Sequence, residues 1–233
     1  MEQKTIAIVG ASSGIGRALA ERLLAQNHTL ITIGRGQPEG LTATHINWEA
    51  TPALDAPLDG IPDTLHGLVY APGTIRLAPF SELSIADYQH DLAINTLGAI
   101  AVLKAAMPSL LKAKGASVVL FSAVAAHLGI GLHSAVSVTK SANEGLTKSL
   151  AAEYAPYQVR VNAVSPSLTD TPLAEQAGLL DDKRREAAGQ RHPLGRIGQP
   201  ADVASLIAYL LSDEASWITG QVIGVDGGYS TLK

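Results

Sequence analysis

The chain of 233 residues contains no cysteine, which excludes disulfides, thiol nucleophiles and thiolate metal sites. Aromatic residues make up only 4% of it, and its net charge of −4 includes no cluster of lysine and arginine. Without a basic patch, the sequence lacks the electrostatic footprint of a protein that binds nucleic acid or an acidic membrane surface. No signal-peptide hydrophobic segment precedes the first apolar run. We therefore expect a cytoplasmic protein with no nucleic-acid partner, no membrane partner and no metal site.

A long unbroken apolar run is also missing. The longest apolar stretch, residues 94–111, is interrupted by Asn95, Lys104 and Pro108, so it predicts a helix buried on most sides rather than a membrane span. With 46% hydrophobic residues the chain can nevertheless bury one large core. We expect a single domain over residues 1–233.

Predicted strands and helices alternate along the chain. Most of the strands are short apolar runs without polar alternation, which is typical of a parallel sheet covered on both faces. Right-handed crossovers then predict an α/β Rossmann fold, a doubly wound seven-stranded parallel sheet flanked by helices that binds its ligand at the strands' C-terminal ends. The predicted strands are residues 5–9, 29–34, 43–47, 66–70, 116–122, 158–164 and 221–225, and the predicted helices are 15–26, 86–112, 134–155 and 200–212.

Two connections depart from this alternation. Residues 48–64 hold three prolines and little periodicity, which predicts mostly loop with a helix short or absent. Residues 167–198 are polar and charged, with one helical pattern near residues 181–188. A connection of that length in a compact domain is often a lid, so we expect a lid-like insertion there.

The first predicted strand runs directly into a glycine-rich turn that opens an amphipathic helix. Gly10 allows the sharp turn, Gly14 allows close approach of a pyrophosphate, and Gly16 lets the helix lie tight on the strand. The free N–H groups of the helix's first turn would face the phosphates. An ordinary tight turn is the alternative interpretation. The residues assigned to this predicted dinucleotide site are Gly10, Ser12, Ser13, Gly14, Ile15 and Gly16.

Later segments extend this pattern over essentially the whole chain, and together they resemble the short-chain dehydrogenase/reductase family. The matching pieces are Leu68-Val69-Tyr70-Ala71-Pro72-Gly73, Asn95 with Gly98, Lys140, Val161 to Pro166, Thr219-Gly220-Gln221 and Asp226-Gly227-Gly228. Some positions depart from the family pattern: Val9 stands where threonine is usual, Tyr70 and Ala71 replace two asparagines, and Ser167 follows Pro166 where glycine is usual.

The resemblance implies further cofactor contacts. It places Asn47 against the adenine, residues 71–73 beside its ribose, Lys140 on the nicotinamide ribose, and Thr169 and Thr171 near the nicotinamide amide. The set is Asn47, Ala71, Pro72, Gly73, Lys140, Pro166, Thr169 and Thr171. It also implies a homotetramer or homodimer, with the helices at 86–112 and 134–155 in one interface and residues 216–219 in another.

The residue after the second strand selects between the two nicotinamide cofactors. An acidic side chain there would bond a ribose 2′-hydroxyl and repel a 2′-phosphate, whereas an arginine can pair with the phosphate. This chain has Gly34 followed by Arg35, which favours NADP(H). A solvated surface arginine is the alternative interpretation.

The catalytic pattern of the family is broken. Its tyrosine, which exchanges a proton with the substrate oxygen, should lie one helical turn before Lys140, and that position is Val136. The family's serine should lie thirteen residues before the tyrosine, and that position is Ala123, preceded by Ser122. Neither valine nor alanine can exchange a proton, so the usual relay is absent.

Other side chains remain as candidates for the chemistry. By resemblance, Asn95 and Lys140 hold a water and the nicotinamide ribose. His127 and His133 lie between Ser122 and Lys140, in the segment that the resemblance implies lines the substrate pocket, and either could replace the phenol. Ser122 could supply a hydroxyl, although a serine or histidine in such a loop is more often a structural residue.

Three functions follow from this pattern. The first is an NADP(H)-dependent oxidoreductase acting on a small carbonyl or alcohol, whose proton comes from a histidine, from Ser122, or from water held by Asn95 and Lys140. The second is an NADP(H)-binding pseudoenzyme or regulatory protein that has lost the chemistry. The third, a lyase or dehalogenase-like enzyme, is disfavoured because the cofactor features are intact.

Overall fold

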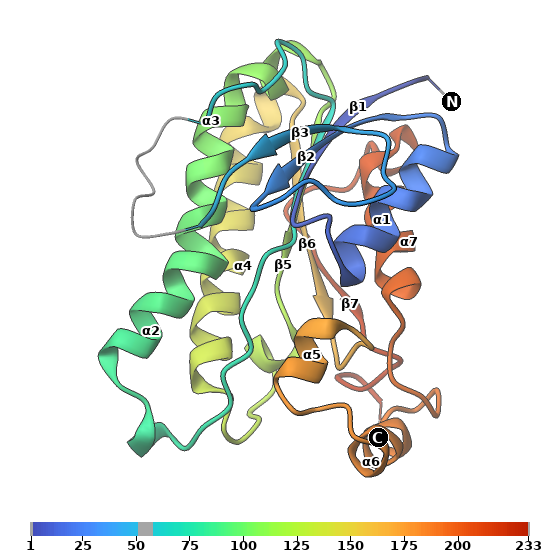
Figure 1. The fold of residues 1–233 in the computed structure, drawn as a ribbon. Coiled ribbons are helices and arrows are strands. Elements are labelled where there is room, and N and C mark those ends of the chain that lie inside the picture. The colour runs from blue at the N-terminus through green and yellow to red at the C-terminus, as the bar shows by residue number, and fades with distance from the viewer. Residues whose placement is uncertain (1, 51–57, 233) are drawn as a thin grey trace.

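The computed structural model describes residues 2–50 and 58–232. Seven parallel strands form one sheet in the order β3-β2-β1-β4-β5-β6-β7, so the chain reverses its winding direction after β3 (Figure 1). The predicted doubly wound α/β fold is therefore confirmed. The strands are β1 (Thr5–Val9), β2 (Thr29–Gly34), β3 (Thr44–Asn47), β4 (Gly67–Tyr70), β5 (Ser117–Phe121), β6 (Arg160–Pro166) and β7 (Val222–Val225).

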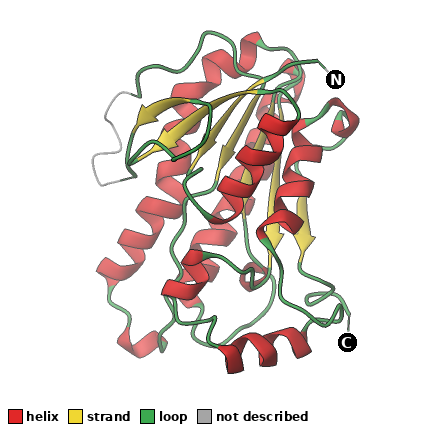
Figure 2. Cartoon of the chain, turned by 45° about the vertical axis from the view of Figure 1, so that its right-hand side comes forward, coloured by secondary structure: helices red, strands yellow, loops and turns green. Residues whose placement is uncertain are grey.

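Helices cover both faces of the sheet, with α2, α3 and α4 on one side and α1 and α7 on the other (Figures 1 and 2). The α-helices are α1 (Gly14–Ala25), α2 (Ile85–Leu92), α3 (Gly98–Lys112), α4 (Ser134–Tyr154), α5 (Pro172–Gln176), α6 (Asp182–Arg191) and α7 (Pro200–Leu211). The shorter helical turns are η1 (Phe80–Glu82), η2 (Ala93–Leu97), η3 (Val124–Ala126), η4 (Ala155–Tyr157) and η5 (Asp213–Ala215).

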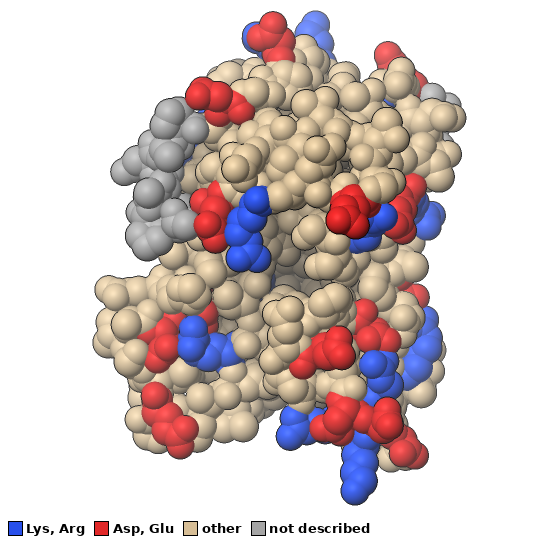
Figure 3. All heavy atoms as spheres, viewed as in Figure 1, with Lys and Arg blue, Asp and Glu red and all other residues tan. Residues whose placement is uncertain are grey.

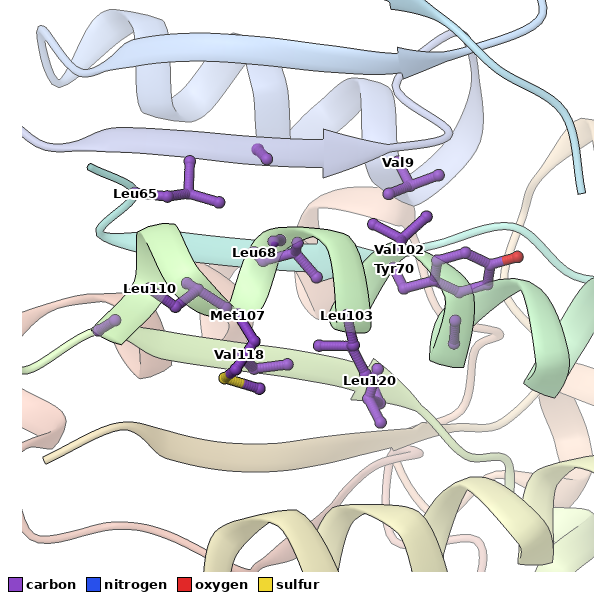
Figure 4. Close-up of a cluster of buried hydrophobic side chains, with 14 of the residues drawn as sticks. Val9, Leu65, Leu68, Tyr70, Val102, Leu103, Met107, Leu110, Val118 and Leu120 are labelled. Carbon is purple, nitrogen blue, oxygen red and sulfur yellow. The ribbon is translucent and has the colours of Figure 1, made fainter. Parts of the chain in front are cut away.

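Each face of the sheet buries its own apolar cluster. Side chains of α3 meet those of β1, β4 and β5 on one face, as Figure 4 shows for Leu68, Leu103 and Val118. On the other face α1 and α7 pack against the opposite side chains of the same strands, and this cluster includes Ile8 of β1 and Ile207 of α7. Burial on both faces explains why the strands show no polar alternation.

The predicted helix at 86–112 is not one regular helix. It consists of α2, the π-helical turn η2 and α3. Tyr70 explains the irregular turn, because its buried hydroxyl donates a hydrogen bond to the Ile94 carbonyl (2.6 Å). Gly98 makes room for this contact, since a Cβ there would lie 2.3 Å from the Tyr70 oxygen. A single π turn inside a helix commonly marks a functional site, and this one carries Asn95.

Residues 85–112 also meet the length and composition of a membrane span, with half of their most apolar window buried inside the protein. Helix α3 contributes Val102, Leu103, Ala106 and Leu110 to the core beneath it. It is therefore a core helix of this fold, in agreement with the prediction from its interrupting polar residues.

The two irregular connections differ in what they contain. In the described part of residues 48–64 there is no helix, as predicted, while residues 51–57 lie outside the described residues. Residues 167–198 hold two helices, α5 and α6, whereas the sequence predicted only the second. Thr171 explains the first, because its hydroxyl caps α5 by accepting from the Ala174 N–H (3.2 Å).

Candidate functional site

One cavity of about 1270 Å³ lies at the C-terminal ends of the strands. Figure 3 shows the molecule hollowed near the centre of this face, with acidic and basic side chains scattered around the opening. Loops that follow β1, β2, β4, β5 and β6 all contribute to its wall, together with α5 and α6. The cavity occupies the position where a doubly wound sheet binds its ligand.

The glycine turn after β1 forms one end of the cavity. Gly10 has φ +80° and Gly14 has φ +54°, conformations that L side chains rarely adopt. A Cβ on Gly16 would lie 2.2 Å from the Gly10 carbonyl oxygen, so only glycine lets α1 begin against the turn. The Ser13 side chain does not cap α1, so the N–H groups in the first turn of this helix stay available to an anion.

Fourteen of the fifteen residues predicted to bind the cofactor line this cavity, and Asn47 is the exception. Asn47 is exposed and borders a separate shallow hollow, while its neighbours Trp48 and Glu49 line the main cavity. The fourteen lining residues are Gly10, Ser12, Ser13, Gly14, Ile15, Gly16, Arg35, Ala71, Pro72, Gly73, Lys140, Pro166, Thr169 and Thr171.

Arg35 lies at the same end of the cavity with its side chain 81% exposed. Its nearest acidic partner is Glu49, at 3.8 Å between Nη1 and Oε1. A Cβ added to Gly34 or Gly36 would meet no atom within 4 Å, so the surroundings of the guanidinium are open. This arrangement leaves room for a phosphate beside Arg35. The phosphate would replace the Arg35–Glu49 ion pair, which is long and solvated and contributes little to stability.

Lys140 lies at the other end of the cavity, on α4, with only 8% of its surface exposed. Burial lowers the pKa of its ammonium from 10.5 to about 8. Gly73 stands between it and Asn95, since a Cβ there would be 3.0 Å from Asn95 Oδ1 and 3.4 Å from Lys140 Nζ. A ligand with hydroxyl groups beside Gly73 would therefore reach a buried ammonium.

Asn95 is fully buried and does not line the cavity. Its amide nitrogen donates to Thr74 Oγ1 (2.7 Å) and to the Asp91 carbonyl (2.8 Å), and its amide oxygen accepts from the Thr74 N–H (3.3 Å). Its backbone carbonyl accepts from Asn143 Nδ2 (3.1 Å). In this structure Asn95 holds the loop after β4 in position beside Lys140.

Ser122 and His127 form a separate cluster around an acidic side chain that the sequence analysis overlooked. The Ser122 hydroxyl donates to Glu144 Oε1 (2.5 Å), and His127 Nε2 lies 3.0 Å from the same oxygen. Glu144 is one helical turn beyond Lys140 on α4. Ser122 borders the cavity, but neither His127 nor Glu144 does, so His127 is not placed to meet a substrate there.

The positions of the missing catalytic residues form an apolar part of the wall. Ala123 and Val136 both line the cavity, and Val136 is 6% exposed. His133 also lines it, three residues before Val136. Its Nδ1 lies 2.7 Å from the Gly131 carbonyl, which can only accept, so Nδ1 carries the proton and Nε2 remains open.

A second polar pair in the wall was missed by the sequence analysis. His192, which follows α6, is 5% exposed, and its Nε2 lies 2.9 Å from Ser167 Oγ. Both residues line the cavity, and the Tyr229 ring lies 4.9 Å from the imidazole, between centroids. The one sequence signal was Ser167 itself, which stands where glycine is usual.

Residues 167–198 are anchored at both ends. The Gly198 N–H donates to the Leu168 carbonyl (2.9 Å), and the Asp170 N–H donates to the Gly198 carbonyl (2.8 Å). Arg185 of α6 forms an ion pair with Asp170. These contacts join the two ends of residues 167–198, so the segment between them closes one side of the cavity.

Comparison with known proteins identifies the family. The enoyl-(acyl carrier protein) reductase family model matches residues 10–230. The 3-oxoacyl-(acyl-carrier-protein) reductase FabG of Thermotoga maritima is 34% identical, over 98% of each chain. The aldohexose dehydrogenase of Thermoplasma acidophilum, in ligand-free form, has a TM-score of 0.91 at 33% identity and covers 100% of this chain and 96% of its own.

A short-chain dehydrogenase/reductase from Brucella melitensis has a TM-score of 0.86 at 32% identity and covers 98% of this chain and 97% of its own. The glycine turn, the buried lysine and the cavity between them agree with these matches. This chain therefore belongs to the short-chain dehydrogenase/reductase family of oxidoreductases, whose members bind a nicotinamide cofactor.

Proposed function

We propose that this protein is an NADP(H)-dependent oxidoreductase that interconverts a small carbonyl compound and an alcohol, with its proton handled by a group other than tyrosine. The observation that carries the proposal is one continuous cavity with Arg35 and the glycine turn at one end and the buried Lys140 at the other. Bound there, a nicotinamide cofactor supplies or accepts the hydride.

The residues present fit such a cofactor. The first turn of α1 would bind the pyrophosphate through its free N–H groups, and Arg35 would pair with the 2′-phosphate. Lys140 would donate to the ribose beside Gly73, while Thr169 and Thr171 line the wall where the nicotinamide amide would lie. The lid would exclude water from the reacting atoms.

The names of the relatives cover both a 3-oxoacyl-(acyl-carrier-protein) and an aldohexose, so we propose the broader class of small carbonyl compounds and alcohols. Placement of substrate beside the nicotinamide supplies most of the acceleration, and acid catalysis adds about 10² to 10⁴-fold. An activated carbonyl needs the least help from an acid. Of the two histidines among the sequence-predicted candidates, His133 is the one that lines the cavity, three residues before Val136.

Cofactor preference is tested by titrating the purified protein with NADPH and with NADH and following nicotinamide or tryptophan fluorescence. We expect micromolar NADPH binding and weaker NADH binding. Replacement of Arg35 by glutamine should weaken NADPH binding by about 10-fold or more and leave NADH binding nearly unchanged, because one charge-assisted phosphate pair is lost. Glu49→Gln, which removes the competing carboxylate, is the matched control and should strengthen NADPH binding slightly.

The second candidate is a protein that binds NADP(H) without turning it over. The paired replacement of the family's serine and tyrosine by Ala123 and Val136 favours it. The two candidates are separated by measuring NADPH oxidation with 4-nitrobenzaldehyde, an activated carbonyl, in the wild type and in Lys140→Ala. Turnover well above that of the variant supports the enzyme, and equal turnover supports the binding protein.

We further propose a cytoplasmic homodimer or homotetramer. Leu97 and Val138 stay 45% and 46% exposed on the side of the molecule covered by η2 and α4, and Trp217 is 98% exposed near the C-terminal strand. An apolar surface of this kind favours burial against a second copy. Light scattering of the purified protein tests the oligomeric state, and Trp217→Ser should shift it if that residue is in an interface.

A further inference from the structure

We propose that Ser167 and His192 form a proton relay that takes the place of the missing tyrosine. The inference rests on the proposed oxidoreductase function and assigns its proton-transfer step to two residues outside the family's catalytic set. It starts from their hydrogen bond in the wall of the cavity.

The geometry fixes the direction of that hydrogen bond. His192 Nδ1 lies 2.7 Å from the Ala188 carbonyl oxygen, which can only accept, so Nδ1 carries a proton. In the neutral imidazole Nε2 is then a lone-pair acceptor, and it faces the Ser167 hydroxyl at 2.9 Å. A hydroxyl, a base and a group that orients the base are the parts of an activated serine pair.

The location of Ser167 connects the pair to the missing residues. Strands β5 and β6 pair in parallel, with Phe121 opposite Val164. Ala123 follows Phe121 by two positions and Ser167 follows Val164 by three, so both leave the sheet at the same edge. Ser167 therefore lines the same cavity as Ala123, the position where the family's serine is expected.

The surroundings hold the pair in place and leave it in contact with the cavity. Thr169 Oγ1 donates to the Ser167 carbonyl (3.0 Å), and Tyr229 packs against the imidazole. Asp226 is the acidic group that faces His192 from the segment after β7. Burial alone would raise the pKa of Asp226, but hydrogen bonds from Ser230 and Gly228 and the nearby His192 lower it.

The proton balance of the relay is complete in the direction of reduction. A hydride from the reduced nicotinamide forms the new C–H bond at the carbonyl carbon, and the C=O π pair moves to the oxygen. That oxygen takes the Ser167 hydroxyl proton as Ser167 Oγ takes the Nε2 proton of the His192 imidazolium. The neutral imidazole regains a proton from water, and oxidation of an alcohol runs the same transfers in reverse.

Nitrogen NMR of the histidine side chains provides a test that does not depend on activity. We expect neutral His192 to carry its proton on Nδ1, and we expect Ser167→Ala to shift the Nε2 signal. A neutral His192 that carries its proton on Nε2, or an Nε2 signal that Ser167→Ala leaves unchanged, overturns the relay.

Kinetics with NADPH and 4-nitrobenzaldehyde test its role in turnover. Ser167→Ala should lower kcat by about 10²-fold with an unchanged NADPH dissociation constant, and Ser167→Thr, which keeps a hydroxyl, should recover most of it. His192→Gln should remove the imidazole-dependent limb of the pH profile of kcat. Ser149→Ala, at an exposed serine of α4 that does not line the cavity, is the matched control and should leave kcat within about twofold.

The failures can be told apart. If the wild type turns over and Ser167→Ala matches it, the relay is overturned while the oxidoreductase stands, and loss of turnover in His133→Ala would then assign the proton to His133. If the wild type binds NADPH but reduces no aldehyde, the proposed function and the relay both fall.

Discussion

The two ends of the cavity differ in how closely they follow the family pattern. At the end formed by β1, α1 and Arg35, the glycines have the conformations and close approaches that a dinucleotide site requires. For example, a Cβ on Gly16 would lie only 2.2 Å from the Gly10 carbonyl oxygen. At the other end Lys140 remains, but Ala123 and Val136 leave an apolar wall in place of two hydroxyl groups. The glycine-turn end of the cavity thus keeps the family pattern, whereas the end beside Lys140 departs from it at Ala123 and Val136.

The largest expected effect comes from restoring the lost groups. The double variant Ala123→Ser/Val136→Tyr places a phenol one turn before Lys140, whose buried ammonium would favour the phenolate. Because Val136 lines a cavity of about 1270 Å³, the larger ring has space. We expect kcat for 4-nitrobenzaldehyde reduction to rise about 10²-fold or more.

The single variant Val136→Phe is the control for this prediction. It adds the ring without the hydroxyl and should give no gain in kcat. If the double variant binds NADPH but is no faster than the wild type, then the rest of the active site is not arranged for this chemistry, and the two ends of the cavity differ by more than the two hydroxyl groups.

The same contrast explains what the sequence could predict. The fold and the glycine turn follow from short-range patterns, namely apolar strands, amphipathic helices and glycine spacing, and the predicted strands match to within about two residues. The π turn at Asn95 was missed because it depends on a hydrogen bond from Tyr70, twenty-four residues earlier in the chain. Helix α5 was missed because it is only five residues long.

The polar partners of the site could not be predicted for a related reason. Ser122 borders the cavity, but the sequence gives no indication that its hydroxyl donates a hydrogen bond to Glu144. Ser167 and His192 are twenty-five residues apart and meet only because the segment 167–198 folds back on β6. Contacts of this kind are set by tertiary packing, whereas motif spacing reports only positions within one helix or turn.

Lys140 provides the second prediction, of intermediate size. Because burial lowers its pKa from 10.5 to about 8, the unfolded chain binds more protons than the folded one between those values, and stability should rise with pH from about 8 to 10.5. Below pH 8 Lys140 is charged in the folded protein, and the desolvation of that charge lowers the free energy of unfolding of the cofactor-free protein by its full amount. Lys140→Met should therefore be more stable than the wild type at pH 7, by on the order of 1 to 3 kcal/mol.

Urea unfolding of the cofactor-free protein at pH 7 and at pH 10 measures this effect. The advantage of Lys140→Met should shrink at the higher pH. Lys148→Met, an exposed lysine on the same helix, is the matched control and should change little at either pH. An equal advantage of Lys140→Met at both pH values would mean that its charge is not penalised in the folded state. With NADPH present, the wild type should become more stable than Lys140→Met, because the cofactor stabilises the protein that keeps the lysine expected to bind its ribose.

The smallest effect is expected for substitution of His127. This prediction tests whether His127 has only a structural role or takes part in chemistry at the Lys140 end of the cavity. His127 Nε2 is 3.0 Å from Glu144 Oε1, but its side chain is 41% exposed and does not line the cavity. His127→Ala should therefore cost less than about 1 kcal/mol of stability and leave NADPH binding and kcat within about twofold. Glu144→Gln should cost more, because the buried Ser122 hydroxyl loses its charged acceptor. A large loss of kcat in His127→Ala, with the fold intact by circular dichroism, would instead assign a catalytic role to the cluster of Ser122, Glu144 and His127.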